Sequence, residues 1–294
     1  MRSIKLPEAY KYIAVFPTMR CNLKCSFCLN AFSKDFNRNR FHEISGEQWI
    51  KALNRIETRE DVPITFSGGE PFLHPEFIHI LNNLKSSINI DILTNLYNET
   101  LVNKFINNVS PKRIKRNSPY ASIRVSYHPE QMEAERLIKN VKLLQDAGFS
   151  VGIWAVQYPS SHQLQSITQM QFLCKAEGID FRLKDFTGAY KGELYGDYSK
   201  YPNSVSNSIP KKCLCKTSEL IIGPNGNIYR CHRDLFAEEN PVGNLLDENF
   251  QIEDRFRQCD KYGNCHPCDV KLKTNHKQQL GHTSVEIKDI EENS

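Results

Sequence analysis

The sequence predicts an α/β fold followed by a smaller cysteine-rich unit. Short β-rich runs alternate with amphipathic helical runs from about residue 12 to residue 186, the pattern of repeated βα units around a parallel sheet. Nine of the ten cysteines fall in two groups, one near the start of the chain and one after residue 212. The segment between them that spans residues 190–212 has little periodicity and is rich in Gly, Tyr, Ser, Asn and Pro. It therefore predicts a domain junction.

The strands of the α/β part are expected where short runs are rich in β-branched and aromatic residues. Six such runs are enough for an open or partial barrel. They are Tyr12–Thr18, Ile64–Ser67, Asn89–Asn95, Ser122–His128, Ser150–Gln157 and Asp180–Phe186.

Amphipathic helices are expected between these strands. Ser45 and Gln48 form a capping box at the start of the first helix, and Gly148 and Gly178 end the last two. The expected helices are Ser45–Glu57, Pro75–Lys85, Glu99–Val109, Gln131–Ala147 and Ser161–Glu177.

The C-terminal part contains SELIIGPNGNIYRC, in which two apolar runs flank Pro224-Asn225-Gly226. This pattern predicts a β-hairpin that delivers Cys231. From Lys271 onward the chain is polar, so a loosely held tail is expected. The expected boundaries are 1–189 for the α/β core, 190–212 for a linker, 213–270 for the cysteine-rich domain and 271–294 for the tail.

Composition indicates an ordinary globular protein of the cytoplasm. Hydrophobic residues are 39% and charged residues 24%, and the net charge of +4 is too mild to imply a nucleic-acid partner. No secretory signal or membrane-spanning run is expected. Because the cytosol keeps thiols reduced, ten cysteines favour metal ligation over disulfides. Cys174, within a helical pattern, is expected to be a small core residue.

Three cysteines follow the first expected strand with the spacing CxxxCxxC, at Cys21, Cys25 and Cys28. Ligands of open α/β sheets gather at the carboxyl ends of the strands. Three thiolates cannot close a tetrahedral zinc site, and they supply one ligand fewer than a cubane iron-sulfur cluster usually takes. One iron would therefore remain open to another ligand, although a zinc knuckle or chance stays an alternative.

A second element, ITFSGGEP, covers residues 64–71. Gly68 and Gly69 at a strand end allow positive φ and close backbone approach. Glu70, before Pro71, places a carboxylate near the cysteine loop, where it suits a ligand ammonium.

Both elements resemble the signature of the radical S-adenosylmethionine (SAM) superfamily. In this chain Phe27 is the aromatic residue of CxxxCxΦC, and GGEP is complete at residues 68–71. The resemblance implies a partial (β/α)6 barrel with a 4Fe-4S cluster on the three cysteines. It also implies SAM bound to the open iron through its amino and carboxylate groups, with GGEP contacting the amino group. Asn95 and Ser126 would lie where strand ends contact the ribose or methionine of SAM.

Side-chain alternation along the strands predicts a polar lumen of mixed charge. Arg124 and Lys184 are expected to bind a substrate carboxylate or phosphate. The alternative is a structural ion pair with Asp91. The polar side chains assigned to the lumen are Thr65, Ser67, Asp91, Asn95, Ser122, Arg124, Ser126, His128, Arg182 and Lys184.

The second cysteine group is compatible with structural zinc when taken alone. Its members are Cys213, Cys215, Cys231, Cys259, Cys265 and Cys268. After a radical SAM-like barrel, Gly226 before Cys231 and the CxxC pair are similar to twitch and SPASM extensions, which carry auxiliary 4Fe-4S clusters. Six cysteines are too few for two fully protein-ligated clusters, so one auxiliary cluster is expected. Its expected ligands are Cys213 or Cys215 with Cys231, Cys265 and Cys268, and the role of Cys259 stays open.

The resemblance implies an enzyme that reductively cleaves SAM to a 5′-deoxyadenosyl radical and removes a hydrogen atom from a polar substrate. The substrate would be a peptide or protein side chain or a small metabolite, and the auxiliary cluster would assist a net oxidation or bond formation. A reductant such as flavodoxin or ferredoxin is the expected partner, with no membrane. Two alternatives remain, an RNA-modifying enzyme, from the basic stretch PKRIKRN at residues 111–117, and a non-enzymatic zinc-binding interaction module.

Overall fold

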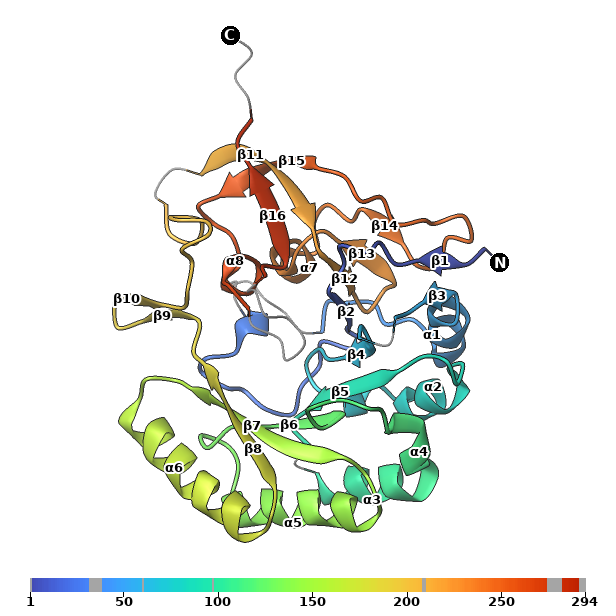
Figure 1. Ribbon diagram of the computed structural model, residues 1–294, viewed down its shortest axis with the longest axis vertical. Helices are drawn as coiled ribbons and strands as arrows, with labels where there is room; N and C mark the ends of the chain where they lie inside the picture. Colours follow the sequence, from blue (N-terminus) through green and yellow to red (C-terminus); the bar gives the residue numbers. More distant parts are fainter. Residues whose placement is uncertain are drawn as a thin grey trace.

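A large sheet runs through the molecule (Figure 1). The computed structural model describes residues 2–31, 39–59, 61–96, 98–207, 210–273 and 282–290. Within these ranges the sheet has the order β14-β13-β12-β2-β4-β5-β6-β7-β8, and its strands from β12 to β8 are parallel. The strands that match the sequence prediction are β2 (Tyr12–Val15), β4 (Ile64–Phe66), β5 (Ile90–Thr94), β6 (Ile123–Tyr127), β7 (Val151–Gln157) and β8 (Asp180–Asp185). This parallel series fits a partial barrel.

Helices pack on one face of this sheet, as predicted. The capping box of Ser45 and Gln48 is present, and Gly148 and Gly178 have φ of +90° and +66°. The helices are α1 (Gly46–Leu53), α2 (Phe77–Asn83), α3 (Glu99–Asn108), α4 (Pro111–Ile114), α5 (Ala134–Asp146) and α6 (Ser161–Ala176), with short 3-10 turns η1 (Leu29–Ala31) and η2 (Pro71–Leu73).

The apolar residues of the strands explain this packing. Along β6, Ile123, Val125 and Tyr127 are buried in one core with Leu137 and Val141 of α5. Successive side chains of a strand point to opposite faces, so the residues between them face the other side, the barrel lumen. Cys174 on α6 is fully buried in the same core, which confirms that prediction.

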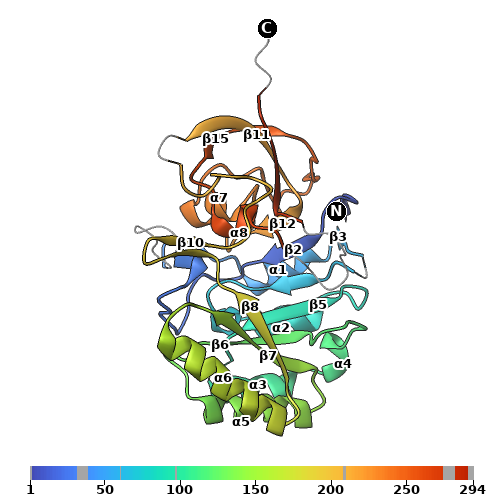
Figure 2. The same cartoon turned by 60° about the vertical axis from the view of Figure 1, so that its left-hand side comes forward.

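The C-terminal part continues the barrel sheet. The predicted hairpin forms from β12 (Glu219–Ile222) and β13 (Asn227–Tyr229), with Gly226 at φ +78°. Its first strand then pairs in parallel with β2, so that Leu220 lies opposite Ile13. Figures 1 and 2 both draw β12 beside β2, with helices α3, α5 and α6 at the far end of the molecule. The remaining elements here are α7 (His232–Ala237), β14 (Gly243–Asn244) and α8 (Pro267–Val270).

A second sheet covers the cysteine-rich part. It consists of β11 (Lys211–Thr217) between β15 (Arg257–Tyr262) and β16 (Val285–Lys288). The prediction of a loosely held tail is wrong for β16, because its backbone pairs with β11 and Val285 is buried. The rest of that tail, at residues 274–281 and 291–294, lies outside the described residues.

Two further pairs of short strands were not predicted. β9 (Gly188–Tyr190) and β10 (Glu193–Tyr195) form a hairpin at the start of the expected linker. β1 (Ile4–Lys5) pairs in parallel with β3 (Ile56–Glu57). The first helix was expected to reach Glu57, but it ends at Leu53, because Ile56 instead packs as a strand residue against Ile4 in the core.

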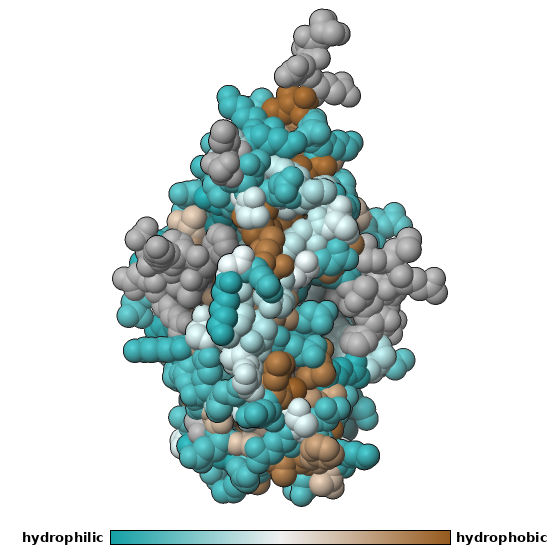
Figure 3. Space-filling model, turned by 90° about the vertical axis from the view of Figure 1, so that its left-hand side faces the viewer, coloured by the Kyte–Doolittle hydropathy of each residue, from teal (hydrophilic) through white to brown (hydrophobic). Residues whose placement is uncertain are grey.

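The face of the molecule that carries β8, β9, β10 and α6 is mostly hydrophilic, with hydrophobic colour in a few separate patches (Figure 3). Across the described ranges, no helix combines the length and the apolar character needed to span a membrane.

Candidate active site at the carboxyl ends of the strands

The CxxxCxxC loop and the GGEP loop lie against each other, just beyond the ends of β2 and β4. The Gly69 N–H donates to the carbonyl oxygen of Thr18 (3.0 Å), and the Glu70 N–H donates to that of Arg20 (2.7 Å). Cys21, the first cysteine of the loop, comes directly after Arg20. The two motifs that the sequence singled out are therefore neighbours in space.

Only glycine fits at the two GGEP glycines. Gly68 has φ +128°, and a Cβ there would overlap with the carbonyl oxygen of Thr18. A Cβ at Gly69 would overlap with the carbonyl oxygens of Met19 and Arg20. The absence of side chains is what lets the loop after β4 approach the cysteine loop so closely.

Glu70 is a buried carboxylate at the base of this contact. It accepts hydrogen bonds from the N–H groups of Phe72 (3.1 Å) and Asn95 (2.7 Å) and from Thr94 Oγ1 (2.8 Å). Burial raises the pKa of Glu70 to about 7, although these hydrogen bonds lower it. Its hydrogen-bond partners within the described residues are all uncharged. A ligand ammonium would stabilise the ionised form.

Asn95, at the end of β5, connects to the cysteine loop. Its Nδ2 donates to Asn22 Oδ1 (2.8 Å) and lies 3.8 Å from Cys21 Sγ. Ser126 lies two residues after Arg124 on β6, is half-buried, and pairs opposite Trp154 of β7. Asn95 therefore lies at the cysteine loop, whereas Ser126 lies within strand β6.

Two charged residues that the sequence analysis missed brace the segment before Cys21. Arg20 donates to both carboxylate oxygens of Glu43, from Nε (2.9 Å) and Nη2 (2.7 Å), and Nη2 also donates to the carbonyl of Leu73 (3.0 Å). Thr18 Oγ1 donates to the same carboxylate. No spacing signal marks this pair, since Glu43 belongs to a separate loop.

The loop that follows β6 holds the other end of the cysteine loop. The Lys24 N–H donates to Gln131 Oε1 (2.7 Å), and the Ser26 N–H donates to Glu130 Oε2 (3.0 Å). These bonds fix the backbone on both sides of Cys25. No sequence motif marks Glu130 or Gln131.

Phe27 opens a row of aromatic rings. It stacks on Tyr158 with ring centroids 4.9 Å apart and lies 5.6 Å from the ring of His128. Tyr158 in turn contacts Phe186 and Tyr190, each at 5.0 Å. Burial lowers the pKa of His128 to about 4, so this imidazole is neutral at pH 7. The rings extend from the cysteine loop to the β9–β10 hairpin.

The lumen contains the ion pair that was weighed against substrate binding. Asp91 is fully buried and accepts from Arg116 Nε (2.6 Å) and Nη2 (2.9 Å) and from Arg124 Nη2 (3.1 Å). Arg124 therefore has the alternative role, a structural ion pair with Asp91. One carboxylate here serves two guanidinium groups.

The basic stretch at residues 111–117 is partly internal. Arg116 points to Asp91, and Arg113 donates to the carbonyl oxygens of Leu81 (3.1 Å), Ile88 (3.0 Å) and Lys85 (3.2 Å). Both arginines are therefore used inside the protein, which removes half the charge that motivated an RNA partner.

Lys184, near the end of β8, is exposed and lies among other cations. Desolvation lowers its pKa to about 7, together with the charges of Arg124, Lys271 and Lys273, while the Cys268 thiol acts in the opposite direction. No hydrogen bond or ion pair reaches Lys184 from the described residues.

Most of the second cysteine group gathers around β11. Cys213 and Cys215 are both buried and lie two residues apart, so they share one face of the strand. Cys213 lies opposite Cys259 of β15, and a hydrogen bond between them lowers the pKa of Cys259. Cys265 and Cys231 pack in the same cluster with Cys215.

Cys268 stands apart from these thiols. Its electrostatic neighbours include Lys184, Lys273 and Tyr198, toward the lumen. In the described parts of the chain, no three His, Cys, Asp or Glu side chains converge on a single metal-ion position.

His266 connects the two cysteine groups. It is fully buried, and its Nδ1 accepts from the Cys268 N–H (3.2 Å), which leaves Nε2 to donate to the carbonyl oxygen of Leu29 (3.0 Å). Leu29 directly follows Cys28. Burial lowers the pKa of His266, so the imidazole stays neutral at pH 7. One side chain therefore links the loop of the first group to the helix that carries Cys268.

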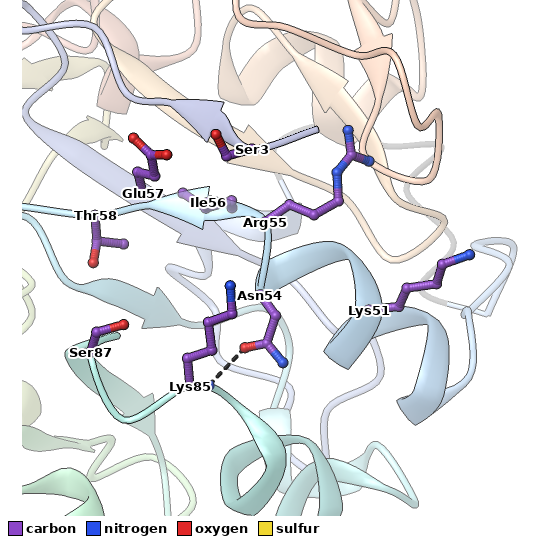
Figure 4. Close-up of a pocket in the computed structure, with 9 residues that line it drawn as sticks. All are labelled: Ser3, Lys51, Asn54, Arg55, Ile56, Glu57, Thr58, Lys85 and Ser87. Carbon is purple, nitrogen blue, oxygen red and sulfur yellow. Dashed lines mark hydrogen bonds between the residues drawn. The ribbon is translucent and has the colours of Figure 1, made fainter. Parts of the chain in front are cut away.

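The cavity drawn in Figure 4 is not part of this site. It measures about 530 Å³ and is lined by Ser3, Lys51, Asn54, Arg55, Ile56, Glu57, Thr58, Lys85 and Ser87. These residues precede β4 and β5, so the cavity lies at the amino ends of the strands, away from the cysteines. The Arg55 guanidinium is occupied by the carbonyl oxygens of Arg2, Leu245, Asp247 and Glu248.

One known protein family matches the part of the chain that contains the two motif loops. The family described as the Radical SAM superfamily matches residues 15–158. That stretch runs from the end of β2 to Tyr158 and contains both the CxxxCxxC loop and the GGEP loop.

The curated relatives carry names of two different kinds, a cyclase and a maturation protein. The GTP 3′,8-cyclase of Aliarcobacter butzleri is 22% identical over 257 residues, which cover 82% of this chain and 79% of that protein. A probable GTP 3′,8-cyclase of Methanocella arvoryzae is 39% identical over 79 residues, 26% of this chain. The sporulation killing factor maturation protein SkfB of Bacillus subtilis is 32% identical over 76 residues, 25% of this chain. The last two matches span only 24% and 18% of those proteins.

Solved structures share the fold. The enzyme anSMEcpe with bound AdoMet matches with a TM-score of 0.52 and 15% identity, over 81% of this chain and 79% of that one. The same enzyme with AdoMet and the Cp18Cys peptide matches with a TM-score of 0.50 and 17% identity, over 81% and 78% of the two chains.

Proposed function

Because residues 15–158 form a radical SAM domain, we propose that this chain removes a hydrogen atom from a polar substrate held in the lumen of its barrel. The chain is a radical SAM enzyme, and enzymes of this superfamily use a 4Fe-4S cluster and SAM. The substrate is a peptide or protein side chain or a small metabolite. The reaction takes place in the cytoplasm and draws electrons from a reductant such as flavodoxin or ferredoxin.

The observation that carries the proposal is the contact between the two motif loops. Three cysteines that are in no disulfide, Cys21, Cys25 and Cys28, lie on one loop at the carboxyl end of β2. The buried Glu70 carboxylate, which has only uncharged hydrogen-bond partners in the described structure, lies on the adjoining loop. Thiolate donors and an uncompensated carboxylate suit a cluster and the ammonium group of SAM, respectively.

The residues of the site have separate roles in this proposal. Cys21, Cys25 and Cys28 hold the cluster, and Glu70 holds the SAM amino group. Phe27 offers a ring face to the cofactor, already stacked on Tyr158. Asn95 and Ser126 are assigned to the ribose or methionine part of SAM. The ion pair between Arg20 and Glu43 holds the cysteine loop in position before any cofactor binds.

A cluster held by Cys21, Cys25 and Cys28, together with SAM held by Glu70, would supply one electron and a 5′-deoxyadenosyl radical for hydrogen-atom abstraction. An auxiliary cluster held by the second cysteine group would supply an acceptor for a further electron. The product is then that of a net oxidation or bond formation. The protein positions the reacting groups and excludes water. The neutral His128 and the row of aromatic rings that begins at Phe27 place apolar surface next to the cysteine loop.

The second cysteine group is proposed to hold one auxiliary 4Fe-4S cluster. Cys215, Cys231 and Cys265 pack together, which supports them as ligands. Cys259 packs in the same cluster and pairs with Cys213, so either of these thiols is a candidate for the fourth position, alongside Cys268. The packing of this group against β16 supports a site shielded from solvent.

The test is a comparison of Cys25→Ala with Cys174→Ala. The wild-type protein, reconstituted anaerobically, is expected to hold about eight irons with matching sulfide, for two cubanes. It is also expected to release 5′-deoxyadenosine from SAM when reduced. Cys25→Ala is expected to hold about four irons and to release none. Cys174→Ala removes a buried thiol outside both groups and is expected to retain both properties.

The proposal fails if Cys25→Ala cleaves SAM at the wild-type rate, or if zinc replaces iron in the wild-type protein. Fractionated cell extract, added during anaerobic turnover, then identifies the substrate class. The fraction that accelerates SAM cleavage, and from which deuterium passes into 5′-deoxyadenosine, contains the substrate.

A further inference from the structure

Resting on the proposed function, we propose that Glu130 is a positioning residue that lowers the reduction potential of the core cluster, the one on Cys21, Cys25 and Cys28. A lower potential makes a stronger one-electron donor, which the reductive cleavage of SAM requires. Glu130 acts through the backbone of the cysteine loop and through its own negative charge. The loop after β6 thereby serves the site without holding a cofactor itself.

Glu130 binds the cysteine loop with both of its carboxylate oxygens. Its Oε2 accepts from the Ser26 N–H (3.0 Å), and its Oε1 accepts from the Ser26 hydroxyl. Ser26 directly follows Cys25 in the chain. The carboxylate is therefore bonded to the neighbour of a proposed cluster ligand, in a fixed orientation. Contacts that lie behind the ligands in this way tune metal sites in proteins.

Further contacts hold Glu130 in this place. The next residue, Gln131, accepts from the Lys24 N–H (2.7 Å), and the Gln131 N–H donates to the carbonyl oxygen of His128 (3.0 Å). The ring of His128 lies 5.6 Å from that of Phe27. The loop after β6 and the cysteine loop therefore touch at several points, so the position of Glu130 does not depend on one exposed hydrogen bond.

The hydrogen bonds of the cysteine loop bear on the potential. An N–H group that donates to a cluster sulfur raises the reduction potential, because it stabilises the added electron. Cys21 Sγ has two such donors close to it, the Leu23 N–H (3.4 Å) and Asn95 Nδ2 (3.8 Å). The N–H groups of the residues before and after Cys25 donate instead to side-chain oxygens of the loop after β6. These two donors are therefore withheld from the cluster sulfurs.

The charge of Glu130 acts in the same direction. A carboxylate repels an electron that is added nearby, which disfavours the reduced state. No cation of the described residues forms an ion pair with Glu130, and His128 beside it is neutral at pH 7, because burial lowers the pKa of His128 to about 4. The other charged support of the cysteine loop, Arg20 with Glu43, is an ion pair and adds no net charge.

The alternative role of Glu130 is structural alone. Ser26 and Glu130 are both exposed, and a contact at the surface can serve only to order a loop. In that case a substitution would lower the iron content without changing the potential of the cluster that remains. The potential and the iron content together therefore separate the two roles.

The test is a redox titration of the anaerobically reconstituted protein, followed by electron paramagnetic resonance, with iron content determined in parallel. The signal of the core cluster is the one that Cys25→Ala lacks. Glu130→Gln keeps the size of the side chain and removes its charge. It is expected to hold about eight irons and to raise the ratio of reduced to oxidised core cluster about fivefold at the wild-type midpoint. This ratio corresponds to about 41 mV, from about 59 mV per tenfold for one electron.

Two further variants separate the charge from other effects. Glu130→Asp keeps the charge near the loop, and its ratio is expected to stay within about twofold of wild type. The matched control is Glu135→Gln, which makes the same change of charge at an exposed glutamate of α5 and is expected to leave the ratio unchanged.

The inference is overturned if Glu130→Gln holds the wild-type amount of iron and has the wild-type potential. It is also overturned if Glu130→Gln loses the core iron, because the contact would then serve to retain the cluster, or if Glu130→Asp shifts as far as Glu130→Gln. A wild-type protein that lacks the core signal would overturn the proposed function itself, which tells that failure from a failure at Glu130 alone.

Discussion

At the scale of single residues, Glu70 combines a structural cost with a binding role. Its carboxylate is buried, and uncharged donors are its hydrogen-bond partners in the described residues, so the ionised form is poorly stabilised until a cation arrives. Because its folded pKa is about 7, above the ordinary value of 4.5, the folded protein binds a proton there more tightly than the unfolded chain does. Stability contributed by this proton is complete below about pH 4.5 and is lost as the pH rises through about 7.

We therefore expect Glu70→Gln to change the pH dependence of stability in the SAM-free protein. Relative to the variant, the wild type should lose of the order of 3 kcal/mol between pH 4.5 and pH 8, from 1.36 kcal/mol per unit of pKa shift. Urea unfolding at several pH values measures this difference. Glu57→Gln, at an exposed glutamate, is the control and should follow the wild type. Parallel curves for wild type and Glu70→Gln would contradict the assignment.

The sequence predicted the residues of the two motifs but not their supports. Gly68 and Gly69 stand out because a strand followed by two glycines and a carboxylate is a local pattern. Arg20 and Glu43 form their pair across separate loops, and charged residues of this kind occur throughout the chain. Such pairs depend on tertiary placement, so a single sequence does not distinguish them from solvated surface charges.

At the scale of elements, the strands and helices of the barrel were predictable because each is long enough to show its period. The predicted strands pair in parallel in chain order, and helices α5 and α6 end just before the predicted Gly148 and Gly178. β16 was missed because it has only four residues, VEIK, in a polar region, and its partner β11 is far away in the sequence. The β9–β10 hairpin was also not predicted, because each of its strands has only three residues.

Val285 shows what β16 contributes. It is buried with Cys215 and Val270, where a charge would have no partner. Val285→Asp is expected to destabilise the C-terminal sheet by about 3 kcal/mol and to lower the iron content from about eight to about four. Iron and sulfide analysis with circular dichroism measures both effects.

Glu286→Gln is the matched control for Val285→Asp. Glu286 is partly exposed and lies 3.7 Å from Lys216, so its loss should change stability by less than about 0.5 kcal/mol. Full iron content in Val285→Asp would mean that β16 does not support the second cysteine group.

At the scale of the whole molecule, His266 connects the two cysteine groups. Replacing it with Phe keeps a ring of similar size but removes both of its hydrogen bonds, to Leu29 and to Cys268. Each bond contributes about 1 kcal/mol, so hydrogen exchange in the loop from Cys21 to Asn30 is expected to rise by roughly fivefold. Mass spectrometry of peptides from residues 21–30 measures this rise in hydrogen exchange, far in the sequence from the substituted residue.

His162→Phe, on the exposed face of α6, is the control and should leave that loop unchanged. A rise in exchange confined to residues 266–270 would show that the loop is held by other contacts. The hydrogen bond from His266 to Leu29 was not predictable, because a histidine between two cysteines is typical of a metal ligand.

The attachment of β12 to β2 also lay beyond the sequence. The hairpin was predicted from Pro224-Asn225-Gly226, but a hairpin alone does not say which strand it will join. The expected linker suggested an appended domain, whereas the backbone of the C-terminal part enters the barrel sheet directly.

This pairing makes the two halves of the protein mutually dependent. Without β12, the flank of β2 would present bare amide and carbonyl groups, which in other proteins invite association with foreign chains. The strand that leads into Cys21 would be the one left exposed. The barrel and the C-terminal part therefore depend on each other. A substitution that displaces β12 would first disturb β2 in the barrel.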